Sequence, residues 1–267
     1  MNALQSTTDL SRFASINADH AAGDVSASYA FIPTTRALSV LADRGWHPVK
    51  AQERAVRKEE YRGFQHHVIR LRQATQPAVA VNETLPEIVL LNSHNRSSAF
   101  QIKAGIFRLV CANGLVVADT LYATHAIRHT GFTDAKVLDA IEDVEGSFTR
   151  IGSTIASWRE LPVTPAEQDA FAASAALLRW EADKAPDPRV LLHVRRSDDA
   201  APTVWHTFNR VQENLLGGMT RRSAYRASGY QRSQAHAIRE VKGVTQGVGL
   251  NQALWALTEK FAALKGA

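Results

Sequence analysis

This chain of 267 residues contains one cysteine, Cys111, and no long apolar run. A lone cysteine cannot form an internal disulfide, and it excludes a zinc site built on cysteine pairs. Because it stands in the apolar segment Phe107-Arg-Leu-Val-Cys, we expect it in the core rather than as a nucleophile. Charges interrupt every apolar run before about 18 residues, which excludes a transmembrane helix. Met1 to Ala30 lacks a basic start followed by an apolar segment, so we expect a soluble cytoplasmic protein without a secretory signal.

Enzyme signatures are equally scarce. The sequence lacks the G-x-x-x-x-G-K-[ST] loop that holds nucleotide phosphates, the G-x-S-x-G elbow and H-E-x-x-H. The glycine-rich segment Gly243 to Gly249 is not embedded in a strand–turn–helix unit, so we interpret it as a flexible turn before the last helix. His125 and His129 can share a metal ion if their segment is helical, but no third ligand accompanies them. We therefore expect no enzyme activity, no cofactor and no metal.

The positive charge of the chain is concentrated in one stretch. Lys and Arg number 31 against 26 Asp and Glu, a net charge of +5. Seven bases and two acids lie between Arg210 and Lys242, so this stretch carries a charge equal to the whole excess. A local basic stretch of this kind is typical of a protein that binds a polyanion such as nucleic acid. The alternative is a solvated helix face, or salt bridges to acids elsewhere in the fold.

Hydrophobic periodicity predicts an α+β fold, in which an antiparallel β-meander is packed by long helices and followed by a helical C-terminal part. We expect a helix from Arg36 to about Arg44, capped by Thr34 or Thr35. The predicted strands span Trp46 to Val56, Gln65 to Gln73 and Pro86 to Asn92. Two apolar runs follow, at Ala99 to Ile102 and at Ile106 to Cys111. A hairpin is predicted at Asn113-Gly114, with a return strand over Leu115 to Ala118.

Helices dominate the remainder of the predicted chain. We expect a long amphipathic helix from Thr133 to Ile155, a second from the cap Thr164 to about Ala182, a third from Thr203 to Gly217-Gly218 and a last one from Asn251 to Lys265, with a short strand over Leu191 to Arg195. The stretch from Thr220 to Gln234 has poor periodicity and is predicted to be a loop. These elements divide into a flexible arm (1–28), an α+β core (29–182) and a helical region (183–267).

Basic residues interleaved with aromatic ones are the candidate nucleic-acid contacts. Arginine pairs with phosphate, and flat rings can stack on unpaired bases. The group at a predicted hairpin tip is Arg57, Lys58, Arg62 and Phe64, and Arg96 stands in a turn-rich loop. The group in the basic stretch is Arg221, Arg222, Tyr225, Arg226, Tyr230 and Arg232. In the alternative interpretation, Tyr225 and Tyr230 pack on the core while the arginines stay solvated.

The segment from Leu91 to Val117 resembles the plasmid- and phage-borne proteins catalogued as domain of unknown function 932, as do Trp205 to Leu216 and Asn251 to Leu257. This resemblance covers roughly residues 29 to 265 and implies a mobile genetic element. The predicted order of a helix, a three-stranded meander and a long helix is similar to the core of the single-strand annealing proteins of the RecT, Redβ and Rad-type groups. That second resemblance implies a homo-oligomer, a ring or filament that holds DNA in a basic groove.

The leading hypothesis is a non-enzymatic protein of a mobile element that binds single-stranded DNA and anneals complementary strands without ATP. The first alternative is a protein-binding module that inhibits host restriction or immunity. A metal-dependent nuclease is the third, with Asp119, Asp134 and Asp139 as the acids to test, although they form no compact cluster in the sequence.

Overall fold

The computed structural model describes residues 8–25, 29–73, 84–108, 114–116, 124–127, 133–220 and 237–266. The chain forms two compact units, Met1–Phe148 and Thr149–Ala267. The division falls inside the long helix α2 (Asp134–Glu160), earlier in the chain than the expected boundary at residue 182. Within the described residues, no helix is both long and apolar enough to cross a bilayer.

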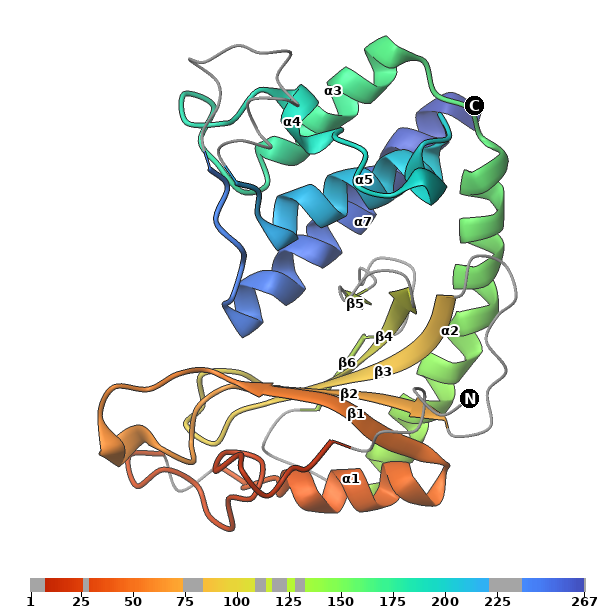
Figure 1. Cartoon of the computed structure of the whole chain (residues 1–267). Coiled ribbons are helices and arrows are strands. Elements are labelled where there is room, and N and C mark those ends of the chain that lie inside the picture. Colours follow the sequence, from red (N-terminus) through yellow and green to blue (C-terminus); the bar gives the residue numbers. More distant parts are fainter. Residues whose placement is uncertain are drawn as a thin grey trace. The chain divides into compact units, whose positions relative to one another are not determined.

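Unit 1 is built on a six-stranded antiparallel sheet, which confirms the α+β class (Figure 1). Its strands are β1 (Trp46–Glu53), β2 (His67–Gln73), β3 (Thr84–Asn92), β4 (Phe100–Arg108), β5 (Gly114–Val116) and β6 (Thr124–Ile127). The first four pair in sequence order, as a meander, and a short 3-10 helix, η1 (Glu59–Tyr61), lies in the β1–β2 connection. Beyond β4, β5 pairs with its second half and β6 with its first half.

The second half of the sheet differs from the sequence prediction in three places. The two apolar runs around residue 104 form one continuous strand, β4. The return strand pairs antiparallel with β4 as expected, but Gly114 already lies in it, opposite Phe107, so Gly114 is not part of the turn, and Asn113 lies outside the described residues. His125 lies in strand β6, so the interpretation of His125 and His129 as one turn of a helix is wrong. His129 and Cys111 lie outside the described residues.

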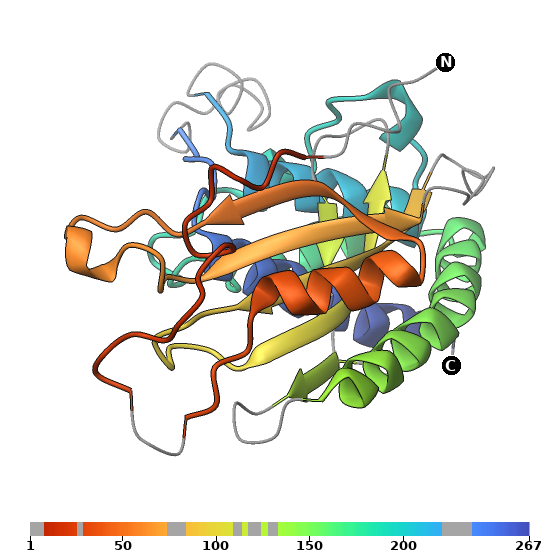
Figure 2. The same ribbon diagram turned by 90° about the horizontal axis from the view of Figure 1, so that it is seen from below.

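Alternation of side chains along the strands gives the sheet two different faces. The odd-numbered residues of β2 and the even-numbered residues of β3 lie on one face, which carries the fully buried Ile69, Leu71, Ile88 and Leu90. Helix α1 (Thr34–Asp43) lies against this face, as Figure 2 shows. Trp46 also belongs to it, because its ring packs on Phe148 of α2 at 5.8 Å between ring centres.

Polar groups fix α1 on the sheet. Pro33 is the N-cap, so the expectation that Thr34 or Thr35 caps the helix is wrong. The Thr34 hydroxyl instead lies 2.9 Å from His67 Nε2 and accepts from Asn92 Nδ2 at 3.0 Å. The Gln65 carbonyl, 3.3 Å from His67 Nδ1, can only accept, so Nδ1 carries the hydrogen and Nε2 accepts from Thr34. The helix therefore begins where its first residue satisfies two buried side chains.

Residues 8–25 are packed on unit 1, so the expectation of a flexible arm does not hold for this part of the segment. Ile16 is fully buried. The Ser15 hydroxyl donates to Glu53 at 2.8 Å, and the Ser15 carbonyl lies 2.9 Å from His94 Nε2. The segment therefore forms part of the buried structure at the end of the sheet where β2 begins and β3 ends.

Unit 2 is helical. It contains the second half of α2, then α3 (Pro165–Ala176), α4 (Pro188–Leu191), η2 (Ser197–Asp199), α5 (Val204–Gly217) and α7 (Val244–Gly266). Thr164 caps α3 through the expected reciprocal pair with Glu167. An aromatic core forms where Trp158 packs on Trp255 at 4.6 Å and Trp205 stacks on Phe208 at 5.6 Å.

Three predictions for unit 2 are wrong. Residues 188–191 form the short helix α4 and no strand follows over 192–195. The glycine-rich segment from Gly243 to Gly249 is expected to be a flexible turn, but all of it except Gly243 forms the first turns of α7. Helix α3 also ends earlier than the expected Ala182, at Ala176.

The environment of His67 gives the first testable prediction. Burial, followed by the neighbouring His94, lowers the pKa of His67 to about 3. Because the unfolded chain takes up this proton near the ordinary pKa of about 6.5, the free energy of unfolding should decrease as the pH falls from about 6.5 towards 3. The expected slope is about 1.4 kcal/mol per pH unit for this group.

His67→Gln keeps an acceptor for Thr34 but cannot be protonated, so the variant should lose this part of the pH dependence. Urea unfolding of both proteins across the pH range measures the difference. Equal slopes in wild type and variant would contradict the assignment.

Candidate nucleic-acid interface

The β1–β2 connection carries the first group of predicted DNA contacts. Lys58 lies 3.5 Å from Glu60, and Arg62 pairs with Glu59 at 3.0 Å. Arg57 is exposed. Phe64 is half-buried and packs edge-on against His20 at 5.4 Å between ring centres. Two of the three cations therefore have acids of the same loop as partners, and the Phe64 ring already has one.

Arg96 lies at the same end of the sheet. The backbone N–H of His94 donates to the Phe64 carbonyl at 3.0 Å, which brings the β3–β4 loop against the β1–β2 connection. Arg96 donates to the Asp24 carbonyl at 3.2 Å. The structure thus brings these five predicted residues to one end of the sheet. The segments that meet there, 8–25, 54–66 and 93–99, hold six bases and five acids, a net charge of only +1.

The other predicted contacts are Arg221, Arg222, Tyr225, Arg226, Tyr230 and Arg232, and they lie outside the described residues. The structure does describe the two ends of the stretch that holds them. Met219 and Ile238 exchange two backbone hydrogen bonds, of 2.7 and 2.9 Å, and so form an antiparallel bridge. The two ends of this stretch therefore lie at adjacent positions in unit 2.

A stronger basic cluster lies on the second face of the sheet, and sequence reasoning missed it. The register places Lys50 of β1 opposite Arg70 of β2, and Lys103 of β4 opposite Val89 of β3. Arg72 and Glu87 lie on the same face by alternation. We define Lys50, Arg70, Arg72, Lys103 and Glu87 as the basic sheet face. It holds four cations and one acid, a net charge of +3.

Glu87 is the centre of this cluster. Its carboxylate accepts from Arg70 at 2.5 Å through Nε and at 2.9 Å through Nη2, and it accepts from Arg72 Nε at 2.6 Å. The Glu87 side chain is 1% exposed, against 11% for Arg70 and 15% for Arg72. Lys103 is buried and Lys50 is exposed, so access to the cluster increases from the centre of the sheet towards β1.

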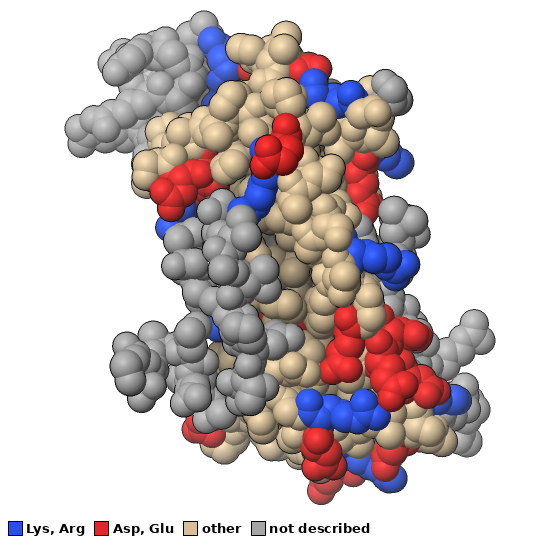
Figure 3. Space-filling view, turned by 90° about the vertical axis from the view of Figure 1, so that its right-hand side faces the viewer, with Lys and Arg blue, Asp and Glu red and all other residues tan. Residues whose placement is uncertain are grey.

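The opposite side of unit 1 has the opposite charge. Residues 34–44 and 134–148, which hold α1 and the first half of α2, carry six acids and three bases, a net charge of −3. Asp139, Glu142 and Asp143 are exposed, and Figure 3 shows acidic side chains gathered over this part of α2. Unit 1 is therefore electrostatically polarised, with a basic sheet face and an acidic helical side.

Of the three acids considered for a nuclease, the two that the structure describes do not form a site. Asp134 pairs with Arg36 at 2.8 Å, Asp139 is exposed on α2, and Asp119 lies outside the described residues. No group of three or more His, Cys, Asp or Glu side chains among the described residues is arranged to hold a metal ion.

Comparison with known proteins agrees with the resemblance seen in the sequence. Residues 21–255 match the family described as Domain of unknown function (DUF932). The chain belongs to the DUF932 family. Two proteins of Escherichia coli (strain K12), UPF0380 protein YafZ and UPF0380 protein YfjQ, are each 34% identical to it over 233 residues, which cover 86% of this chain and 81% of theirs. No solved structure gives a significant match.

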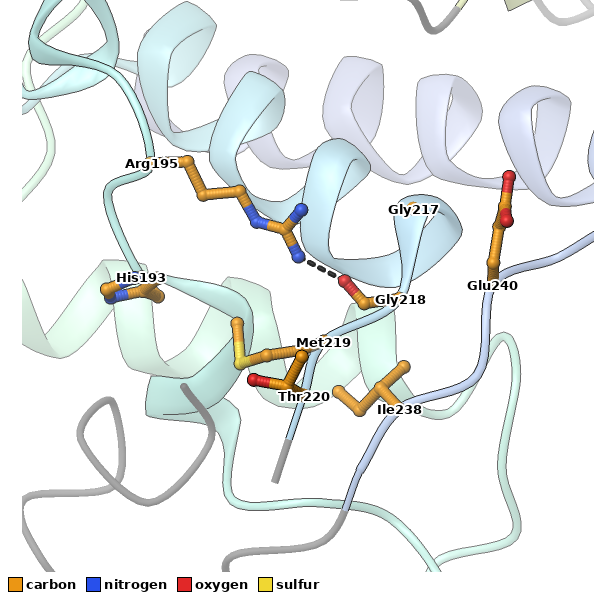
Figure 4. A pocket seen from close by; sticks show the side chains of 8 residues that line it. All are labelled: His193, Arg195, Gly217, Gly218, Met219, Thr220, Ile238 and Glu240. Atoms are coloured by element: carbon orange, nitrogen blue, oxygen red, sulfur yellow. Dashed lines mark hydrogen bonds between the residues drawn. The ribbon is translucent and has the colours of Figure 1, made fainter. Parts of the chain in front are cut away.

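Unit 2 of this DUF932 chain has a cavity of about 510 Å³ beside the Met219–Ile238 bridge (Figure 4). It is lined by His193, Arg195, Gly217, Gly218, Met219, Thr220, Ile238 and Glu240. Arg195 donates to Asn214 at 2.6 Å and to the Gly218 carbonyl, which holds its guanidinium at the end of α5. Burial and then the charge of Arg195 lower the pKa of His193, which favours its neutral form.

Gly218 is required by the close approach of two backbone segments. Its φ is +73°, a conformation that favours glycine. A Cβ at this position would lie 2.6 Å from the Glu240 nitrogen and 2.7 Å from the Ile238 oxygen. Both atoms are backbone atoms and cannot move aside as a flexible side chain would.

Gly218→Ala should therefore destabilise this DUF932 chain by at least about 2 kcal/mol, because it combines a strained φ with a backbone clash. The matched control is Gly152→Ala in the interior of α2, where nothing lies within 4 Å of the added Cβ. That change should raise stability by about 0.5–1 kcal/mol. Urea unfolding monitored by circular dichroism measures both. Similar stability of the two variants would contradict the requirement at Gly218.

Proposed function

We propose that this protein binds single-stranded DNA and promotes the annealing of complementary strands without nucleotide hydrolysis. In this proposal the protein acts as a homo-oligomer and is encoded by a mobile genetic element. The observation that carries the proposal is the basic sheet face, on which four cations share one side of the sheet with the buried Glu87 carboxylate, which is bound to two of them. Arginine and lysine neutralise phosphates and release the counterions condensed on DNA, which is the main source of affinity for a polynucleotide backbone.

The size of the cluster favours a polymer over a small anion. Its cations lie on β1, β2 and β4 of a meander. Neighbouring strands are about 4.8 Å apart, so three strand spacings extend over about 14 Å. A single phosphate group cannot contact side chains over that distance, whereas successive phosphates of one strand can.

The separation of positive and negative charge on unit 1 supports a role in annealing DNA strands rather than in wrapping DNA around the protein. The acidic helical side repels a polyanion, so of these two sides of unit 1 only the basic sheet face attracts a strand. Contacts to phosphates leave the base edges free to pair with a second strand. Such a reaction is driven by base pairing and needs no ATP, which agrees with the lack of a phosphate-binding loop in the sequence.

A protein-binding role against host restriction or immunity is the second candidate. The exposed acids of α2, Asp139, Glu142 and Asp143, favour it, because proteins that bind DNA present basic surfaces to which an acidic surface is complementary. In that case DNA binding would be weak and the helical side, not the sheet face, would carry the activity.

Lys50→Gln tests the leading proposal, with Lys136→Gln on α2 as the matched control. Both lysines are exposed and both changes remove one positive charge. Losing one phosphate contact should lower the affinity for a labelled oligothymidylate about fivefold near 0.1 M salt, and reduce the slope of log affinity against log salt by about 0.7. The control should bind as the wild type does. Fluorescence anisotropy at several salt concentrations measures both quantities.

The annealing of two complementary strands, without ATP or metal, completes the test. If about five phosphates are neutralised per protomer, the wild-type salt slope should be near −3.5. An equal loss in both variants would mean that only net charge matters, and it would contradict a site on the sheet face. A wild-type protein that shows no binding at low salt would overturn the proposed function in favour of the second candidate.

A further inference from the structure

We propose that the cavity of unit 2 binds a guanine base, with Arg195 donating hydrogen bonds to one edge of the base and Glu240 accepting them from another. This inference goes beyond the proposed function, because the cavity belongs to unit 2 and the basic sheet face to unit 1. The cavity volume of about 510 Å³ lies within the range of about 300–1,000 Å³ that is typical of small-molecule sites.

The guanidinium of Arg195 is fixed in place by uncharged groups. Its Nε–H donates to Oδ1 of Asn214 at 2.6 Å, and its Nη2 donates to the Gly218 carbonyl. Asn214 is fully buried, and its amide group also donates to the carbonyls of Leu191 and His193, both at 2.9 Å. Asn214 therefore positions both the arginine and the chain segment that carries it.

Within the described residues, no acid forms an ion pair with Arg195. The next residue, Arg196, differs in this respect, because it pairs with Glu213 at 3.0 Å. A cation at the end of a helix interacts favourably with the helix dipole, but this capping role uses only part of the guanidinium. Two of its five N–H groups make the hydrogen bonds described above, so three remain for a ligand.

Glu240 supplies the opposite charge to the same cavity. Its side chain is exposed and takes part in no ion pair or hydrogen bond in the part of the chain that the structure describes. Figure 4 shows Arg195 and Glu240 on either side of Gly218. A guanidinium and a carboxylate that line one cavity without pairing are complementary to a ligand with acceptors on one edge and donors on another.

The other walls of the cavity suit a flat ring. Met219 and Ile238 are buried apolar side chains. His193 adds an imidazole that packs on no other ring of the described chain. Burial and then the charge of Arg195 lower the pKa of His193, so this imidazole is neutral near pH 7. Unpaired bases stack on histidine rings and on apolar side chains.

Guanine is the nucleobase that carries the required pattern of donors and acceptors. Its O6 and N7 are adjacent acceptors, which match the paired N–H groups of a guanidinium. Its N1–H and its N2 amino group are donors, which match the two oxygens of a carboxylate. Adenine has an amino group beside N7, so Arg195 would meet a donor there. Glu240 would repel a ligand that consists of a phosphate group alone.

Equilibrium dialysis of the full chain with deoxyguanosine monophosphate (dGMP) tests the proposal. The deoxyinosine nucleotide dIMP lacks the N2 amino group, and 7-deaza-dGMP lacks the N7 acceptor. Each should bind at least about fivefold more weakly than dGMP, because each loses a hydrogen bond to a charged group. The adenine nucleotide dAMP, which has the same sugar and phosphate, should bind more weakly than either.

Glu240→Ala tests the carboxylate, with Asp183→Ala as the matched control. Both residues are exposed acids of unit 2, but only Glu240 lines the cavity. If net charge alone set the affinity, both changes would tighten the binding of a nucleotide. We expect Glu240→Ala instead to bind dGMP at least about fivefold more weakly and to bind dGMP and dIMP alike. Asp183→Ala should bind as the wild type does.

Arg195→Gln tests the guanidinium in the same way. This variant should bind dGMP and 7-deaza-dGMP alike. A merely structural role of Arg195 would lower the affinity for both nucleotides and leave their ratio unchanged. Circular dichroism establishes that each variant is folded, and the Glu240→Ala result decides the question if Arg195→Gln does not fold.

An oligothymidylate with one central guanine distinguishes a base in a DNA strand from a free nucleotide. Tighter binding of this strand than of plain oligothymidylate places a strand base in the cavity, whereas equal binding together with dGMP binding assigns the cavity to the free nucleotide. Equal affinity for dGMP, dIMP and dAMP, a failure to bind dGMP, or wild-type dGMP affinity of a folded Glu240→Ala would overturn the guanine site. Failure to bind any oligonucleotide would overturn only the proposed function, because dGMP binding is measured separately.

Discussion

The register of β2, β3 and β4 decides which side chains share a face of the sheet, and the rest of unit 1 depends on it. In the observed register Ile69, Leu71 and Leu90 lie under α1, while Arg70 and Glu87 meet on the other face. A shift of β3 by one residue would exchange the two faces of that strand. The Glu87 carboxylate would then lie under α1, and Ile88 would lie among the arginines. The buried hydrogen bonds of Thr34 and the shared carboxylate of Glu87 therefore oppose slippage from opposite sides of the sheet.

Much of the fold could be predicted because its signals are local. The strand signal over β2 and the capping box at Thr164 act over a few residues, and both elements are present. The errors arose where tertiary packing overrides local preference. Glycines disfavour helices, yet Gly243 to Gly249 leads into α7, whose buried Val248, Leu250 and Leu254 supply the packing. Strand β6 has only four residues and gains its structure from pairing with β4.

The basic sheet face was harder to find because its members are far apart in the sequence. The sequence prediction favoured cations in loops and turns, because side chains there are exposed to solvent. In the structure, however, the loop residues Lys58 and Arg62 have acids of the same loop as partners. A usable signal was nevertheless present. Arg70 and Arg72 alternate with apolar residues in one strand, and Glu87 stands in an otherwise apolar strand. Charges inside two strands that must each be largely buried indicate that the charges meet one another.

The loop end of the sheet and the basic sheet face differ in their balance of positive and negative charge. At the loop end of the sheet six bases face five acids, so an approaching phosphate has to compete with carboxylates already in place. On the basic sheet face Glu87 is buried and accepts hydrogen bonds from two arginines, which fixes the orientation of both guanidinium groups. A carboxylate in that position costs one unit of charge but gains a fixed geometry. Recognition of phosphate by arginine depends on geometry as well as on total charge, and for this reason we propose the basic sheet face, and not the exposed loops, as the site for a nucleic-acid strand.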